Sequence, residues 1–359
     1  MSRVYNFSAG PAVLPECVLE EVAANMVDYH GSGMSLLEMS HRGTIFSQIH
    51  RETLALLREL LSVPETHDIL LLQGGGHSQF AMVPLNLLGA AAEASYIVNG
   101  VWSKKAAAEA AKFCHVNVLG TGSGRTVPPS DSIDVPNDAA YLYYCQNETV
   151  NGLEFNYVPE CPECVPLVSD ISSNFLSRPV DFKRHALVFA GAQKNFGPAG
   201  LVVVIVRKDL LGLAADNCPT MFNYQIHSQA GSLFNTPPTF PIWVANLVCH
   251  WIKNEGGVEV MDRRARERSQ LLYDVIDGSE GFYVNQIAPQ VRSRMNVVFN
   301  LREEALNDLF IKQAADVNIV NIKGHRLVGG MRASVYNAMP MKGAQALAEF
   351  MKDFAQRHG

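Results

Sequence analysis

The chain has little charge and no basic surplus. Only 18% of its 359 residues are charged, and the formal net charge is −6 at pH 7. Binding a nucleic-acid backbone requires a surplus of Lys and Arg, so we expect no nucleic-acid partner. Apolar runs such as 201–206 are far shorter than a bilayer span, and the N-terminus has no apolar stretch typical of a secretory signal. We therefore expect a cytoplasmic protein with no membrane partner.

The sequence also lacks a regular cysteine framework. Seven cysteines are scattered along the chain, which fits reduced thiols in a cytosolic protein better than a set of disulfides. Cys161 and Cys164 have the C-x-x-C spacing of redox and zinc sites, but no second pair follows. We interpret them as two thiols in a proline-rich connector and expect no metal site.

Hydrophobic residues make up 48% of the chain, which is enough for a large core, and the length favours two domains. Short β-rich runs alternate with helical patterns over 68–207. The predicted strands are 69–72, 95–98, 116–119, 140–144, 166–168, 186–189 and 201–206, with helices at 79–88 and 104–112 between them. This alternation indicates an α/β fold with a mostly parallel sheet between helices.

The C-terminal part has a different pattern. Residues 245–277 are helical and charged, and we interpret the arginines there as a solvated helix face: Arg263, Arg264, Arg266 and Arg268. A strand at 293–301, a helix at 303–315, a strand at 332–336 and a helix at 341–357 follow. We therefore expect a large α/β domain at 16–255 and a smaller α+β domain at 256–359, with residues 1–15 packing on the small domain and the site.

Ligands of open α/β sheets lie beyond the carboxyl ends of the strands, so the segments that follow the strands are informative. Strand 69–72 is followed by Gln73-Gly74-Gly75-Gly76-His77-Ser78 and then a helix. A glycine-rich turn before a helix N-terminus can bind an anion through free N–H groups and the helix dipole. A plain tight turn is the alternative. The motif is neither a Walker loop nor a dinucleotide fingerprint.

Three further strand ends carry polar side chains. Thr149 lies in a polar loop after 140–144, Asp170 follows 166–168, and Lys194 follows 186–189 among small apolar residues. A phosphate cradle, a strand-end aspartate and a lysine match the needs of a pyridoxal 5'-phosphate enzyme. The lysine bonds the cofactor and the aspartate pairs with its pyridine nitrogen. Asp170 could instead be an N-cap or Asx turn, and Lys194 a solvated loop residue. Trp102 could stack on the ring or belong to the core.

Arginines next to histidines in glycine-bordered turns form a second pattern. The pairs are His41-Arg42 and His325-Arg326, and Arg332 follows Gly329-Gly330-Met331. Arginine suits planar, bidentate capture of carboxylate and phosphate. In an acidic protein, several such groups predict a small polyanionic substrate, although each group alone could be structural.

Collinear motifs along nearly the whole chain resemble one known family, the phosphoserine aminotransferases of the fold-type-I, class-V group of pyridoxal phosphate enzymes. The motifs are Asn6-Phe7-Ser8-Ala9-Gly10-Pro11-Ala12, Met39-Ser40-His41-Arg42, Gln73-Gly74-Gly75, Gln193-Lys194-Asn195, Phe234-Asn235-Thr236-Pro237-Pro238-Thr239, Gly324-His325-Arg326 and Gly329-Gly330-Met331-Arg332-Ala333-Ser334. The resemblance implies reversible transamination between 3-phosphohydroxypyruvate and glutamate, giving O-phosphoserine and 2-oxoglutarate, in serine biosynthesis. A phosphorylated hydroxythreonine of vitamin B6 synthesis is a second candidate substrate.

The resemblance also implies a role for each matching residue. Lys194 would hold the cofactor, Asp170 would pair with its pyridine nitrogen, Trp102 would stack on the ring, and Thr149 would bind the ring hydroxyl. The cofactor phosphate would be held by Gly76, His77 and Gln193, and by Asn235 and Thr236 of the partner in a homodimer with shared active sites. Arg332 would clamp the substrate carboxylate. His325 and Arg326 would bind the substrate phosphate, with His41 and Arg42 coming from the partner.

Two departures and two alternatives accompany this assignment. Relatives often carry Arg where this chain has His77, so a fixed positive charge is missing there. Some relatives have a second serine where this chain has Ala9, so one side-chain contact to the substrate is missing. Another enzyme of the same fold is one alternative. A desulfurase would need a reactive cysteine, but Cys249 lies in a helical run without activating neighbours. A non-catalytic phosphate-binding protein is the other, and Lys194 counts against it.

Overall fold

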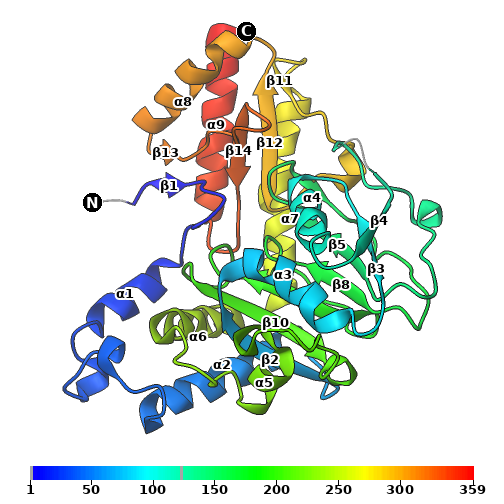
Figure 1. Ribbon diagram of the computed structural model, residues 1–359. Helices are drawn as coiled ribbons and strands as arrows, with labels where there is room; N and C mark the ends of the chain where they lie inside the picture. Colours follow the sequence, from blue (N-terminus) through cyan, green and yellow to red (C-terminus); the bar gives the residue numbers. More distant parts are fainter. Residues whose placement is uncertain (1–2, 122–123) are drawn as a thin grey trace.

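A computed structural model of the chain describes residues 3–121 and 124–359. Residues 1–2 of the expected N-terminal segment lie outside this range. Among the described residues, seven strands form one central sheet in the order β2-β10-β9-β8-β5-β3-β4 (Figure 1). Their bounds are β2 His67–Gln73, β3 Glu93–Ile97, β4 His115–Leu119, β5 Leu142–Cys145, β8 Leu167–Asp170, β9 His185–Gly191 and β10 Leu201–Arg207. β10 is antiparallel to both neighbours, and the other pairs are parallel.

Helices cover both faces of this sheet because alternate residues of its strands point to opposite sides. Ile69 and Leu71 of β2 pack in one cluster with α1 (Glu16–Ala24), α2 (Thr44–Leu61) and α6 (Thr239–Asn254). Leu70 and Leu72 pack in another, with α3 (Gly75–Leu87), α4 (Val101–Ala110) and α5 (Tyr224–Gln229). A strand buried on both faces has no polar alternation, as in the Val202–Val206 stretch of β10.

The seven predicted strands are confirmed, with ends that shift by at most two residues. Two shifts matter for the site. Asp170 is the last residue of β8 rather than the residue after it. The helix predicted at 79–88 begins at Gly75, so Gly75, Gly76 and His77 form its first turn.

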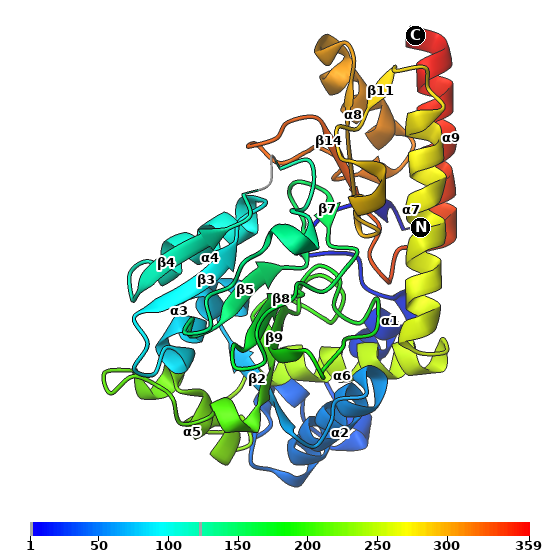
Figure 2. The same cartoon turned by 90° about the vertical axis from the view of Figure 1, so that its right-hand side faces the viewer.

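The C-terminal part has its own small sheet and its own apolar core. The sheet has the order β11-β12-β14, and a second, two-stranded sheet pairs β1 with β13. The bounds are β1 Tyr5–Asn6, β11 Tyr283–Val284, β12 Asn296–Leu301, β13 Ile319–Val320, β14 Met331–Ser334, α7 Val258–Asp277, α8 Asn307–Asp316 and α9 Met341–His358. Figure 2 shows α7 and α9 side by side along one edge, in contact with each other. β6 (Asn147–Glu148) and β7 (Leu153–Glu154) form a separate two-stranded sheet.

The N-terminal segment joins the C-terminal core. Phe7 is fully buried in that core, and its carbonyl accepts a hydrogen bond from the Ser334 amide of β14. The chain then runs toward the central sheet, where the Ala12 amide donates to the Gln193 carbonyl at 2.9 Å. The domain bounds 16–255 and 256–359 stay a prediction.

The interpretation of the α7 arginines as a solvated face is wrong for one of the four. Arg263, Arg264 and Arg266 form ion pairs with carboxylates in partly exposed settings. Arg268 is only 2% exposed, and its Nη1 donates to the carbonyls of Asn337 and Met339. The reason is helical periodicity, since buried residues of α7 recur at 261, 265, 268 and 272.

Over residues 3–121 and 124–359, no helix has both the length and the apolar character needed to cross a bilayer. All seven cysteines are free thiols. Cys161 and Cys164 donate to the carbonyls of Val165 and Asn137, and the described residues contain no cluster of three or more potential metal ligands.

Candidate active site

The strand ends predicted to carry polar side chains lie next to one another. β5, β8 and β9 are neighbours in the sheet, and Asp170 is in register with Cys145 on one side and Phe189 on the other. Thr149 lies four residues beyond β5, and Lys194 lies three beyond β9. Because parallel strands end at the same edge, these side chains converge on one place.

Lys194 is at the centre of this group. Its Nζ donates a 2.7 Å hydrogen bond to Thr149 Oγ1 and lies 5.7 Å from the centroid of the Trp102 ring. Burial lowers the pKa of the Lys194 ammonium, Asp170 and Cys145 oppose that shift, and Arg332 adds to it. A lysine with a lowered pKa is more readily available as the neutral amine, which is the nucleophilic form.

Asp170 is 6% exposed and lies close enough to interact electrostatically with Lys194. Burial raises the pKa of its carboxyl group, while Lys194 and the Ser172 hydrogen bonds act in the opposite direction. Its Oδ1 accepts from the Ser172 amide at 2.8 Å, so the Asx-turn interpretation is confirmed, and the pairing with a pyridine nitrogen stays a prediction. One carboxylate oxygen forms that turn, and the other is left for a ligand.

The first turn of α3 lies beside Asp170. Gly74 has φ +97° and supplies no side-chain cap, so the amides of the following turn have no capping acceptor. A Cβ added to Gly76 would lie 3.6 Å from Ser172 Oγ, and that hydroxyl accepts from the Gly191 amide at 3.0 Å. Ser172 was not among the predicted site residues, and its only signal in the sequence is its position two residues after Asp170. The predicted anion cradle thus borders the strand ends of β8 and β9.

Trp102 is positioned by a residue that the sequence analysis also missed. The fully buried Glu148 carboxylate accepts from the amides of Trp102 and Ser103 at 2.8 and 2.7 Å and from the Ser103 hydroxyl at 2.6 Å. It therefore caps α4 from the loop that carries Thr149. A Cβ on Gly100 would collide with this carboxylate, which explains the glycine before the helix.

The Trp102 ring is held at a defined angle. The edge of the His77 ring contacts it at 5.4 Å between centroids, with 77° between the ring planes. Its Nε1 is buried and has no hydrogen-bond acceptor within the described part of the chain. Glu148 could have been suspected from its place next to Thr149 in the polar loop 146–152.

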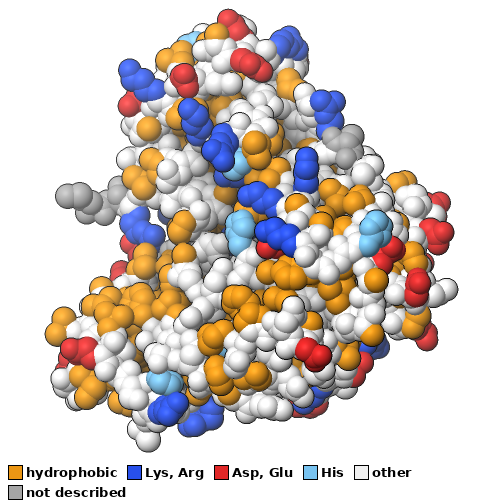
Figure 3. Space-filling view, in the orientation of Figure 1, with side chains coloured by type: hydrophobic (Ala, Val, Ile, Leu, Met, Phe, Trp, Pro, Cys, Tyr) orange, Lys and Arg blue, Asp and Glu red, His pale blue; other side chains and the backbone are white. Residues whose placement is uncertain are grey.

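A cationic cluster faces the same site from the C-terminal part. Burial lowers the pKa of His325, and the positive charges of Arg332, Arg326 and Lys105 lower it further. Burial also lowers the pKa of Arg332, whose Nε is buried without an acceptor among the described residues. Figure 3 shows Lys, Arg and His side chains gathered in the middle of one face, between the upper and lower parts of the molecule. The structure thus brings Arg332, His325 and Arg326 together.

The two parts of the molecule meet around Lys194. The side chain of its neighbour Asn195 accepts from the Asn337 amide at 2.9 Å, and the Tyr336 hydroxyl donates to the Ala9 carbonyl at 2.9 Å. Gln193 lies over Gly191 and accepts from the Ala12 amide through its carbonyl. These bonds fix the lysine between the central sheet and β14.

Four predicted residues are not joined to this group by any hydrogen bond or ion pair among the described residues. His41 and Arg42 precede α2, which lies at the lower edge of Figure 1, whereas β14 lies in the upper part. Asn235 and Thr236 lie in a loop whose Thr236 carbonyl accepts from Gln73 Nε2 at 2.8 Å. Asn235 also lines a cavity of about 260 Å³ next to Gly74.

A partly buried lysine and a buried aspartate at the carboxyl ends of a mostly parallel sheet, with a smaller C-terminal part closing over them, define a fold-type-I pyridoxal phosphate-dependent transferase fold. The chain belongs to the class-V aminotransferase family, whose model matches residues 4–347. It is 51% identical to the phosphoserine aminotransferase of Laribacter hongkongensis, over 99% of each chain.

Solved structures agree with this assignment. Phosphoserine aminotransferase from Bacillus circulans subsp. alkalophilus is 43% identical, with a TM-score of 0.96 and 99% of each chain covered. The pyridoxal phosphate-bound enzyme from Trichomonas vaginalis is 41% identical, with a TM-score of 0.94, covering 98% of this chain and all of that one. The predicted family and fold class are confirmed.

Proposed function

We propose that this protein is a pyridoxal phosphate-dependent aminotransferase that interconverts O-phosphoserine and 2-oxoglutarate with 3-phosphohydroxypyruvate and glutamate, in serine biosynthesis. The observation that carries the proposal is the pairing of a partly buried, Thr149-bonded Lys194 with the cationic cluster of Arg332, His325 and Arg326. Lys194 supplies an amine that can react with the cofactor. The cationic cluster supplies positive charge that can bind a substrate with two anionic ends. The phosphohydroxythreonine of vitamin B6 synthesis has the same two anionic ends and is a second candidate substrate.

The described residues fit the cofactor. The uncapped first turn of α3 at Gly76 and His77, together with Gln193, would hold its phosphate. Asp170 would pair with the pyridine nitrogen. Thr149 would bind the ring hydroxyl once Lys194 is bonded to the cofactor. Trp102 would stack on the ring. Pyridoxal phosphate, when bound, supplies an electron sink that stabilises negative charge on the substrate Cα.

The protein's own groups then divide the remaining work. Lys194 holds and moves the proton of the substrate Cα, since its lowered pKa makes the neutral amine available as a base. Arg332 orients the donor by its carboxylate, which places the Cα hydrogen toward that amine. Asp170, whose negative charge Lys194 and Ser172 favour against the effect of burial on its pKa, would pair with the positive charge of the ring nitrogen.

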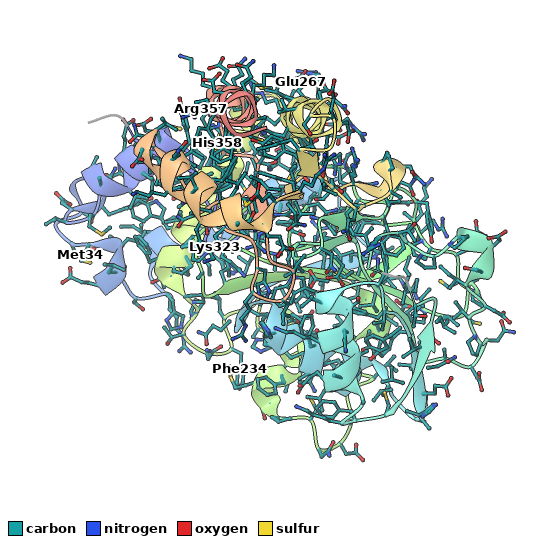
Figure 4. The ribbon with its side chains drawn as sticks, turned by 90° about the horizontal axis from the view of Figure 1, so that it is seen from above. Met34, Phe234, Glu267, Lys323, Arg357 and His358 are labelled. Carbon is teal, nitrogen blue, oxygen red and sulfur yellow. The ribbon has the colours of Figure 1, made fainter. Side chains whose placement is uncertain are left out.

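We also propose a homodimer with shared active sites. Within one chain, His41 and Arg42 lie away from β14, so a partner would have to supply them to the substrate phosphate. Asn235 and Thr236 would likewise reach the partner's cofactor phosphate. Apolar side chains near these loops are unusually exposed, at 44% for Phe234 and 45% for Met34, and Figure 4 shows both at the periphery.

Mixing two inactive variants tests the shared site. Lys194→Ala and the double variant Asn235→Ala/Thr236→Ala are unfolded and refolded together, with each variant refolded alone as the control. If the loop acts in trans, each heterodimer has one native site, and random pairing restores about a quarter of wild-type activity. Activity at background in the mixture would contradict sharing.

Turnover with phosphoserine and 2-oxoglutarate, followed by coupled detection of glutamate, tests the reaction itself. Serine is the matched donor without the phosphate. We expect kcat/KM for phosphoserine to exceed that for serine by at least about thirtyfold, because removing one partner of a hydrogen-bonded charge pair costs about 2–5 kcal/mol. Equal use of both donors would favour an aminotransferase for unphosphorylated substrates.

A desulfurase is disfavoured because Cys249 is fully buried in α6 and burial raises the pKa of its thiol. The free thiols fit the proposed cytoplasmic location.

A further inference from the structure

Lys105 lies one helical turn after Trp102 on α4, and its ammonium group lies 4.7 Å from the centroid of the Trp102 ring. The i, i+3 spacing places both side chains on the same face of the helix. Lys194 approaches the same ring at 5.7 Å. A cation at this distance is attracted by the indole, so an otherwise flexible side chain is held at the edge of the active site.

The surroundings of Lys105 are cationic. Its charge, with those of Arg326 and Arg332, acts on His325. No carboxylate pairs with Lys105 in the part of the chain that the structure describes, whereas Lys112 pairs with Glu109 at 2.6 Å. Three fixed positive charges around a histidine repel one another, and a dianion between them would relieve that repulsion.

We propose that Lys105 is a further binding residue for the phosphate group of the amino donor and helps to select phosphorylated donors over plain ones. This inference rests on the proposed function. There, the substrate phosphate is bound by His325 and Arg326 and by His41 and Arg42 of the partner subunit. Lys105 contributes from a different element, the helix that also carries Trp102. The phosphate would therefore be bound between the Gly-bordered loop at 324–330 and α4.

The expected effect is moderate and falls on KM. Lys105 is exposed, so its charge is partly screened, and an exposed ion pair changes binding by about two- to fivefold. The phosphate carries two negative charges, and the Trp102 indole fixes the position of the ammonium group. For these two reasons we expect a larger change in binding, about five- to tenfold. The phosphate is remote from the reacting Cα and is bound equally in the ground and transition states, so kcat changes by less than about twofold.

Steady-state kinetics of the holoenzyme with phosphoserine and with serine test the proposal. Lys105→Met keeps the apolar stem over Trp102 and removes the charge, while Lys105→Arg keeps the charge. Lys104→Met is the matched control, since Lys104 is also exposed on α4 but is not among the charges acting on His325. We expect Lys105→Met to raise KM for phosphoserine by about five- to tenfold and to leave serine within about twofold. Lys105→Arg restores most of the affinity, and Lys104→Met behaves as wild type.

Inorganic phosphate, as a competitive inhibitor against phosphoserine, gives an independent measure. Its inhibition constant should rise in Lys105→Met by the same factor as KM, and the dependence of KM on ionic strength should become shallower. An unchanged KM, or equal losses with phosphoserine and serine, would overturn the assignment while leaving the proposed function intact. If the wild-type enzyme does not prefer phosphoserine over serine, the proposed function fails and this inference fails with it.

Discussion

Removing the Glu148 carboxylate should loosen α4 and, through it, the cofactor site. Glu148 is fully buried and accepts three hydrogen bonds, two of them from the first-turn amides of Trp102 and Ser103. Truncation to Ala leaves two buried N–H groups without an acceptor, at about 1–3 kcal/mol each. With the small cavity added, we expect Glu148→Ala to lower the free energy of unfolding by about 3–5 kcal/mol.

Glu148→Gln is the conservative comparison. The amide oxygen can accept from one of the two N–H groups, but the NH₂ group faces the other, so the expected loss is about 1–3 kcal/mol. Glu109→Ala on the same helix is the matched control. Its exposed pair with Lys112 contributes at most about 0.5 kcal/mol.

Urea unfolding followed by circular dichroism measures these differences, and titration of the apoprotein with pyridoxal phosphate measures cofactor affinity. Because Glu148 sets the position of Trp102, cofactor affinity should fall in both Glu148 variants and stay unchanged in the control. If Glu148→Ala loses no more stability than Glu109→Ala, the capping argument is wrong. Lost stability with unchanged cofactor affinity would show that the α4 cap does not position the site.

Three further changes have definite expected outcomes. Asp170→Asn should lower kcat far more than cofactor affinity, since the ring nitrogen loses its counter-charge; equal losses would favour a purely structural Asx turn. Arg332→Ala should weaken apparent binding of both phosphoserine and 2-oxoglutarate by about 2–5 kcal/mol in steady-state kinetics; loss for only one substrate would refute a shared carboxylate clamp. Burial lowers the pKa of His185 to about 4 in the folded state, from 6.5 in the unfolded state. The unfolded state therefore binds a proton first as the pH falls. The free energy of unfolding is thus highest above pH 6.5 and decreases as the pH falls toward 4. Between pH 7 and 5 this amounts to about 2 kcal/mol by urea unfolding, and His185→Gln should remove that part of the pH dependence; equal slopes would contradict it.

The sheet could be predicted from the sequence because its strands are buried on both faces. A continuous apolar run such as that of β10 has few other interpretations between glycine-rich turns. The start of α3 could not be predicted, because Gly74-Gly75-Gly76 has the composition of a turn. Only the backbone of the structure, with φ +97° at Gly74 and +64° at Gly75, shows why glycines stand where the helix begins.

The convergence of Asp170 and Lys194 could also be predicted from sequence, because both stand at the ends of recognisable strands and Lys194 lies in a family motif. Lys105 was not predicted, since its importance lies in a contact with Trp102 that no local pattern encodes, and Glu148 had only its place in the polar loop beside Thr149 as a signal. Arg268 shows the opposite failure. Its charge suggested solvent, but the 3.6-residue period of α7 places it on the buried face.

The whole account depends on Lys194 being the residue that bonds the cofactor. Borohydride reduction of the purified holoenzyme, followed by peptide mapping, locates the pyridoxyl group directly. We predict a single label on Lys194, because burial lowers its pKa and Thr149 holds it next to Asp170. A label on any other lysine, or no label on a protein that carries pyridoxal phosphate, would contradict the account.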